Sequence, residues 1–182
     1  MPTAPPPVTL TGTVAFSQIA QSFAQTATVN LAPGSSLTIP ANETLTLAPG
    51  QALNVGGSLT NNGKIVNTSA TTFVLEAGGS LLDPTGQGVL VNGSATQAGT
   101  MKLYGTVTQH TIQNINGTLE IGGAADSNIN IKRLEVSGGT ATLGSGATVD
   151  ATSYTSVDEA VLVTNNGALL VNGATVKPPG QG

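Results

Sequence analysis

Apolar and polar residues alternate along most of the chain, and one stretch of this pattern occurs twice. Residues 31–39 read LAPGSSLTI, and residues 47–55 read LAPGQALNV. Within the second copy, Leu53 and Val55 flank the polar Asn54. Alternation with a period of two indicates a strand that buries one face and exposes the other. The pattern therefore predicts short, half-buried β-strands.

Turns that contain glycine separate these predicted strands. Related units read VLEAGGSLLD at residues 74–83, LEVSGGTATL at residues 134–143 and VLVTNNGALLVN at residues 161–172. Glycine suits such turns because it adopts positive φ at little steric cost. The spacing of the units is irregular along the chain, so we expect stacked coils that differ in the length of their loops.

The composition favours a narrow solenoid over a wider fold. Only 3% of the residues are aromatic, and 24 of the 182 residues are glycine. Stacked Leu, Val, Ile and Ala side chains can fill a narrow solenoid, whereas sandwich cores usually contain large aromatic residues. The sequence therefore predicts an all-β, single-domain β-solenoid (β-helix) of irregular coils. A β-sandwich is the alternative, since many short strands also describe that fold.

A helical pattern interrupts the alternation near the N-terminus. The segment 14–25, VAFSQIAQSFAQ, places Phe16, Ile19 and Phe23 close to one helical face. We expect a short helix that caps the open end of the solenoid, whose backbone edge would otherwise recruit another chain. The alternative is that this face docks on a partner, and the same three residues are then the partner-binding residues.

Both ends of the chain are rich in proline. The leading PTAPPPV and the trailing KPPGQG cannot lie inside a strand ladder, because proline lacks the backbone N–H that the ladder needs. We therefore divide the chain into a Pro-rich arm with the short helix (1–27), the β-solenoid (28–176) and a flexible C-terminal tail (177–182).

Charge and cysteine content argue against several kinds of function. The five basic residues are scattered and the net charge is −4, so no positive stripe is expected to bind nucleic acid. Cysteine is absent, which removes disulfides and thiolate metal sites. The N-terminus lacks the pattern of a secretory signal, and no apolar run is long enough to span a membrane. We expect synthesis in the host cytoplasm and no membrane association.

Few residues are suited to catalysis. The one histidine, His110, lies in an alternating segment, which predicts a position on the surface of a strand. Glu76, Glu120 and Glu135 each precede a turn that contains glycine, so stacked coils could align them into a row. The alternative is that one outward carboxylate per coil maintains solubility. A glycosidase needs a carboxylate pair, and the chain shows neither such a pair nor the repeated calcium motif of some solenoids. We expect no enzymatic activity, no cofactor and no bound metal.

The run LTLAPGQALNVGGSLTNNGKIVN resembles the degenerate β-solenoid repeats of phage virion proteins and bacterial surface adhesins, and the resemblance extends over residues 28–176. The Pro-rich arm and the small apolar helix are similar to the attachment end of a phage decoration protein or fibre. The resemblance implies a non-enzymatic structural protein of the virion, either a capsid decoration (cement) protein or a fibre segment. It also implies a homo-oligomer, as a trimer, that binds the major capsid protein or another virion component.

Two other functions stay open, and both would place the protein at a cell surface or outside the cell. A carbohydrate-binding adhesin or tailspike-like module would gather Asn, Thr, Glu and an aromatic residue in one groove that binds a glycan. Tyr104 and Tyr154 are the candidates to stack on the sugar. A self-assembling surface filament would donate the N-terminal strand PVTLTGTVAF to the next subunit.

Overall fold

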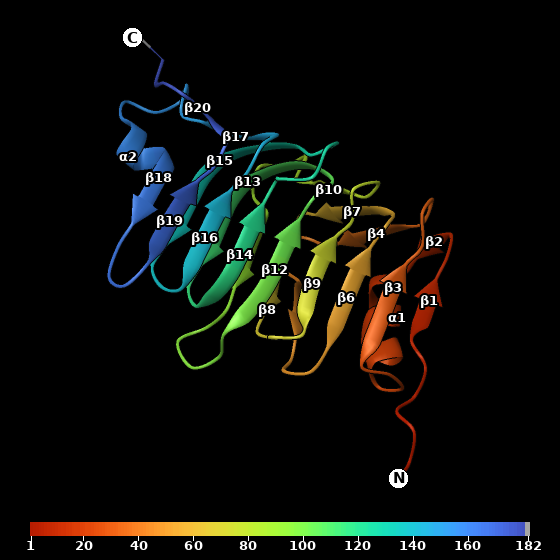
Figure 1. Ribbon diagram of the computed structural model, residues 1–182. Coiled ribbons are helices and arrows are strands. Elements are labelled where there is room, and N and C mark those ends of the chain that lie inside the picture. The colour runs from red at the N-terminus through yellow and green to blue at the C-terminus, as the bar shows by residue number, and fades with distance from the viewer. Residues whose placement is uncertain (181–182) are drawn as a thin grey trace.

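Parallel strands of successive coils stack on one another and wind into a β-solenoid of about 6 turns (Figure 1). The structure is a computed structural model that describes residues 1–180. Strands make up 48% of the chain and helices 7%. The predicted all-β solenoid with a short N-terminal helix is confirmed, and the β-sandwich alternative is wrong.

The first face of the solenoid is an 8-stranded parallel sheet that faces the viewer in Figure 1. Each coil contributes one strand to it, so strands that are neighbours in the sheet lie about one coil apart in the sequence. In order, the strands are β1 (Val8–Leu10), β3 (Thr28–Leu31), β6 (Ala52–Val55), β9 (Thr72–Leu75), β12 (Gly99–Leu103), β14 (Gly117–Ile121), β16 (Thr140–Leu143) and β19 (Ala168–Val171).

The second and third faces are joined, because two long strands run through both. The first half of β13 pairs with β10 and its second half with β11, and β15 continues both pairings. The second face contains β2 (Thr13–Val14), β4 (Ser36–Ile39), β7 (Ser58–Asn61), β10 (Ser80–Leu82), the first halves of β13 (Thr106–Asn114) and β15 (Asn128–Val136), β17 (Ala147–Asp150) and β20 (Thr175–Lys177). The third face contains β5 (Thr44–Leu47), β8 (Lys64–Asn67), β11 (Val89–Asn92), the second halves of β13 and β15, and β18 (Val161–Val163).

The core consists of columns of apolar side chains, one from each coil. The alternating residues predicted to be buried, such as Leu53 and Val55, are fully buried. Because the strands pair in register, Leu53 stacks between Val29 and Phe73 on the two neighbouring coils. Phe73 is the largest of the fully buried side chains, and the rest of the core is mostly aliphatic. Small aliphatic residues therefore fill the narrow interior, as the low aromatic content predicts.

A ladder of asparagines replaces the apolar column at the end of three third-face strands. Asn67, Asn92 and Asn114 are fully buried. The Asn67 amide donates to the side-chain oxygen of Asn92 (3.1 Å), and the Asn92 amide donates to that of Asn114 (2.8 Å). Asn114 in turn donates to the carbonyl of Gly138 (2.9 Å). Buried amides need such partners, so the ladder ties four neighbouring coils together at this corner.

The N-terminal segment belongs to the solenoid, which corrects the predicted boundary at residue 28. Strands β1 and β2 pair with β3 and β4, so the first coil begins at Val8. Strands of three and two residues carry too little alternation to be recognised in the sequence. Helix α1 (Phe16–Phe23) follows β2 at the N-terminal end of the solenoid, inside the predicted segment 14–25.

The C-terminal end of the solenoid carries a much shorter helix. A helix of four residues, α2 (Val157–Ala160), precedes β18. Lys177, which the sequence assigned to the flexible tail, is the last residue of β20 and pairs with Asp150 in the ladder. The last two residues of the predicted tail lie outside the described residues. Among residues 1–180, neither helix has the length and apolarity that a membrane span requires.

Candidate functional site

A groove runs along the corner between the first and second faces, at the carboxyl ends of the first-face strands. Its volume is about 580 Å³. It lies over the turns that follow β14, β16 and β19, and the side chain of Tyr104, just after β12, borders it. The lining residues are Tyr104, Glu120, Gly122, Gly123, Ala124, Thr142, Gly144, Ser145, Asn172 and Gly173.

Backbone hydrogen bonds continue past the strands and set the shape of this groove. The backbone N–H of Tyr104 donates to the carbonyl of Leu75, that of Gly122 to the carbonyl of Leu103, and that of Gly144 to the carbonyl of Ile121. Three successive coils thus place Tyr, Gly and Gly at the same corner position. The Tyr104 ring projects at this position, whereas backbone of the neighbouring turns takes up the Cβ positions of Gly122 and Gly144, so no side chain rises beside the ring there.

Two of the glycines are required by the backbone around them. A Cβ on Gly144 would lie 2.7 Å from the backbone nitrogen of Gly123, which is closer than atoms approach in proteins. Gly123 itself has a φ of 94°, a conformation that other residues adopt only with strain, and a Cβ there would meet nothing within 4 Å. The floor of the groove is therefore closely packed backbone, with open space above it at Gly123.

Tyr104 and Glu120 are in contact at the edge of the groove. The Tyr104 hydroxyl donates a hydrogen bond to Oε2 of Glu120. Burial, together with the bond to the Glu120 carboxylate and its charge, raises the pKa of Tyr104 to about 12. The phenol therefore keeps its proton at neutral pH, and Oε1 of Glu120 remains available as an acceptor. The sequence singled out both residues, but for different reasons, and the structure brings them together.

The predicted row of carboxylates does not form. Glu120 lies on β14 opposite Lys102, whereas Glu76 lies one position beyond the end of β9, at the corner position that Tyr104 occupies on the next coil. Glu135 lies on the third face, in the second half of β15. The shared sequence context misled because loops of different length place the same motif on different faces.

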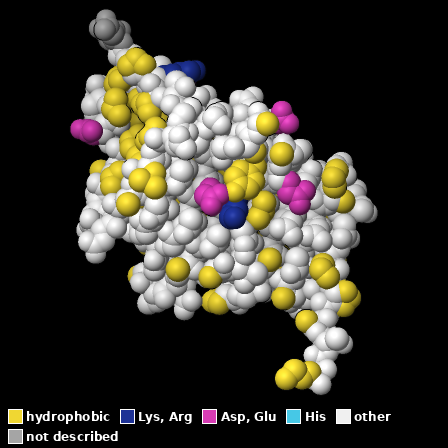
Figure 2. All heavy atoms as spheres, viewed as in Figure 1, with side chains coloured by type: hydrophobic (Ala, Val, Ile, Leu, Met, Phe, Trp, Pro, Cys, Tyr) yellow, Lys and Arg dark blue, Asp and Glu magenta, His cyan; other side chains and the backbone are white. Residues whose placement is uncertain are grey.

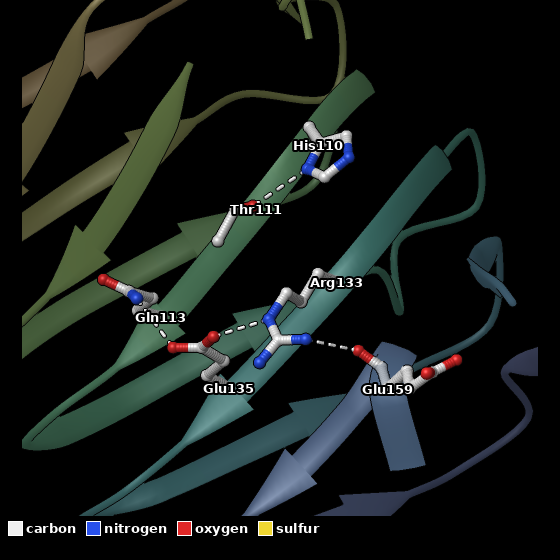
Figure 3. A network of polar contacts seen from close by, with 6 residues as sticks. All are labelled: His110, Thr111, Gln113, Arg133, Glu135 and Glu159. Carbon is white, nitrogen blue, oxygen red and sulfur yellow. Dashed lines mark hydrogen bonds and ion pairs between the residues drawn. The ribbon is translucent and has the colours of Figure 1, made fainter. Parts of the chain in front are cut away.

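Glu135 belongs instead to a polar network on the third face (Figure 3). It accepts hydrogen bonds from Nε2 of Gln113 and from Nε of Arg133, both at 2.6 Å. The guanidinium of Arg133 also donates to the backbone carbonyl of Glu159 in α2, again at 2.6 Å. The network thus links two neighbouring coils to α2 by ordinary surface contacts.

His110 lies at the bend between the two halves of β13. The sequence predicted a surface position, and the side chain is half-buried. Its Nδ1 lies 2.9 Å from the hydroxyl of Thr111, and Figure 3 shows this pair apart from the Gln113–Glu135–Arg133 network. The backbone N–H of His110 donates to Oδ2 of the buried Asp83 (3.2 Å). The histidine is thus not joined to a carboxylate through its ring.

The predicted partner-binding residues share one face of α1. Ile19 is fully buried, while Phe16 and Phe23 are partly buried against the core. Together with Leu45 of β5 they line an apolar groove of about 610 Å³ between the helix and the third face. The helix thus covers Leu45, the first residue of a core column, as expected of a cap. Whether a partner binds in the groove stays a prediction.

The C-terminal coil leaves apolar side chains uncovered. Val171 continues the core column of Leu143, yet Val171 is 56% exposed while Leu143 is fully buried. Val163 likewise continues the column of the fully buried Val136 and is 43% exposed. Together with the outward-pointing Leu170 they form an apolar end, which we call the open end; in Figure 2 yellow side chains gather over these coils.

Sequence reasoning missed the open end and half of the groove. Thr142, Ser145 and Asn172 reach the groove from coils that follow Glu120, and only the register of the strands reveals that they converge. Tyr154, the other aromatic candidate, lies outside this groove and packs against the core. Within the described residues no three His, Asp or Glu side chains lie close enough to hold a metal ion. Comparisons with protein families, curated proteins and solved structures found no match for the chain.

Proposed function

We propose that this chain is a non-enzymatic structural protein of a phage particle, a capsid decoration protein or fibre segment, which acts as a rigid homo-oligomer. The observation that carries the proposal is the open end. Core columns that are fully buried through the solenoid end in side chains that are about half exposed. An exposed apolar surface that ends in unpaired strand edges is stabilised when another protein covers it.

Rigidity follows from the way the coils are joined. From β5 onward neighbouring coils are bonded along three faces, and the asparagine ladder adds buried hydrogen bonds between coils. Few charges interrupt the surface, as the mostly white face in Figure 2 shows, so neighbouring subunits can pack closely without burying unpaired charge. A closed assembly, for which we take a trimer, would cover the open ends and prevent open-ended growth.

The Pro-rich residues 1–7 are the part of the chain that we assign to attachment. They precede the first strand and have no regular secondary structure. An extended proline segment suits a tether to the major capsid protein or another virion component. The phage assignment itself rests on the resemblance of the turn units to virion solenoids.

The proposal is tested by the mass of the purified protein in light scattering. The decisive variant is Leu170→Gln with Val171→Thr, which makes the open end polar without touching the buried core. Leu82→Gln, at an exposed apolar position on the second face, is the matched control. We expect a trimer for the natural chain and the control, and a monomer for the double variant.

A deletion variant tests whether the arm is needed for attachment but not for formation of the oligomer. Only residues 1–7 should be removed, because a longer deletion takes away β1, β2 and α1. The trimer should survive this deletion while attachment to a particle is lost. A monomeric natural chain would overturn the proposal. Open-ended polymers of the natural chain would favour the filament instead, although the structure pairs the segment that a filament would donate with strands of its own chain.

A further inference from the structure

The corner groove described above gathers the groups that recognise a neutral sugar. An aromatic ring offers an apolar face to the C–H groups of a pyranose, and carboxylate, amide and hydroxyl groups pair with its hydroxyls. Tyr104 supplies the ring, Glu120 a carboxylate and Asn172 an amide. Thr142 and Ser145 add hydroxyls between them. Its volume lies within the range of about 300–1,000 Å³ that is usual for small-molecule sites.

The polar groups of the groove are free to bind a ligand. Among residues 1–180, the side chains of Thr142, Ser145 and Asn172 form no side-chain hydrogen bond with one another or with Glu120. Glu120 uses one carboxylate oxygen for Tyr104, and this contact holds the carboxylate in place beside the ring. Fixed groups of this kind lose little conformational entropy when a ligand binds.

The charge of the groove selects the chemical class of the ligand. Glu120 is the one charged side chain among the described residues that line it, and neither lysine nor arginine is among them. Lys102 pairs with Glu120 across the strands but does not line the groove, so a phosphate, a sulfate or a sialic acid in it would lie beside the Glu120 carboxylate with no cation among the lining residues. A single carboxylate is too few ligands for a tightly bound cation. A neutral polyhydroxylated ligand is neither repelled by the carboxylate nor dependent on several charged ligands.

The groove is open along its length rather than closed at both ends. Gly122, Gly123 and Gly144 place no side chain in the groove and Gly123 faces open space, so a linear ligand can lie along the corner from the ring toward Asn172. We propose that this groove binds a neutral oligosaccharide, with one pyranose stacked on Tyr104 and the next residues contacting Thr142, Ser145 and Asn172. The site borders the open end, since Asn172 directly follows Val171, so the test measures the mass of each variant as well as glycan binding.

The first test is a printed array that carries neutral oligosaccharides of glucose, galactose, mannose and N-acetylhexosamines, with sialylated and sulfated forms of the same chains. We expect binding to a subset of the neutral glycans and weaker binding to the acidic form of the same glycan. Isothermal titration calorimetry with the strongest neutral glycan then gives Kd. Binding to no neutral glycan, or stronger binding to acidic forms, would overturn the proposal.

The second test uses variants at the groove. Tyr104→Ala should weaken binding by about tenfold or more, since it removes the stacking surface. Tyr104→Phe keeps the ring and should stay within about threefold of the natural chain. Asn172→Ala, at an exposed position with little risk to folding, should weaken binding by about three- to tenfold. Glu76→Gln, on a neighbouring coil outside the groove, is the matched control and should leave Kd unchanged.

Each variant is also measured by light scattering. Tyr104→Ala and Asn172→Ala should keep the mass of the natural chain, so a failure of this proposal is distinct from a failure of the oligomer. Equal Kd values for the natural chain and both alanine variants would show that the groove is not the binding site, even if a neutral glycan binds elsewhere.

Discussion

The two ends of the solenoid differ in how far the apolar side chains of the core are covered. One core column begins at Leu47, which is fully buried, and ends at Val163, which is 43% exposed. At the N-terminal end α1 lies beside β5 and packs Ile19 into the core. At the C-terminal end α2 has four residues and leaves the last strands uncovered. Within residues 1–180, a helix covers the core at one end of the stack, and apolar side chains are exposed at the other.

This difference suggests which end is intrinsic to the fold and which is available for assembly. The capped end buries its helix as part of the chain's own core, so losing the cap should cost stability. The open end exposes apolar groups without destroying the coils behind it, so changing it should alter association instead. The following predictions test this division, beginning with the largest expected effect.

Shortening the buried side chain of Ile19 in the capping helix should have the largest effect on stability. Ile19→Ala deletes a side chain that is 1% exposed and leaves a cavity against the end of the core. We expect the free energy of unfolding to fall by about 2–4 kcal/mol, as for other large-to-small changes at buried sites. Urea denaturation followed by circular dichroism measures the change.

Gln21→Ala is the control for this experiment, because Gln21 lies on the exposed side of the same helix. It should change stability by less than about 0.5 kcal/mol. Equal effects of the two substitutions would mean that α1 does not function as a cap. Ile19→Ala should also leave any assembly through the open end intact when the folded protein is examined.

An ion pair near the open end should make that end sensitive to acid. Asp150 accepts a hydrogen bond from Lys132 (2.7 Å) and two from Thr152, and these contacts hold the pKa of its carboxyl well below the usual range. A depressed folded-state pKa adds stability above the unfolded-state pKa of about 4, and that stability is lost as the pH falls below it. The C-terminal coils should therefore weaken progressively on acidification below pH ~4.

Asp150→Asn tests this dependence. At pH 7 it should lower the free energy of unfolding by about 1–2 kcal/mol, because it removes a charge-assisted contact. Below pH ~4 the difference between the variant and the natural chain should shrink. Thermal denaturation between pH 7 and pH 3 measures both, with Asp126→Asn at an exposed turn as the control. A constant difference across this range would contradict the assigned role of Asp150.

Alternation and turn chemistry were sufficient to predict the architecture. Positions such as Leu53 and Val55 alternate with polar residues because each strand has one face in the core, and that periodicity is local. The helix was also predictable, since Phe16, Ile19 and Phe23 recur with helical spacing. The first coil was missed because β1 and β2 are too short to show a period.

The groove and the open end depend on information that is not local. Tyr104, Glu120 and Asn172 line one groove only because the strands between them pair in a particular register, and irregular loops hide that register in the sequence. For the same reason Glu76, Glu120 and Glu135 share a motif without sharing a face. Val171 continues the column of the buried Leu143 and is itself exposed, and no property of its own segment indicates this difference.

The smallest effect should come from the contact that ties α2 to the coil beneath it. Arg133→Met removes the bonds to Glu135 and to the carbonyl of Glu159 but keeps most of the apolar stem of the side chain. Surface pairs contribute little, so the free energy of unfolding should change by less than about 1 kcal/mol. Locally the effect should be larger, because α2 is too short to be stable alone. Hydrogen exchange should accelerate in residues 155–162 and stay unchanged in α1. Exchange that is unaltered around α2 would show that the short helix is held by its packing alone, and the two ends would then differ only in the length of their helices.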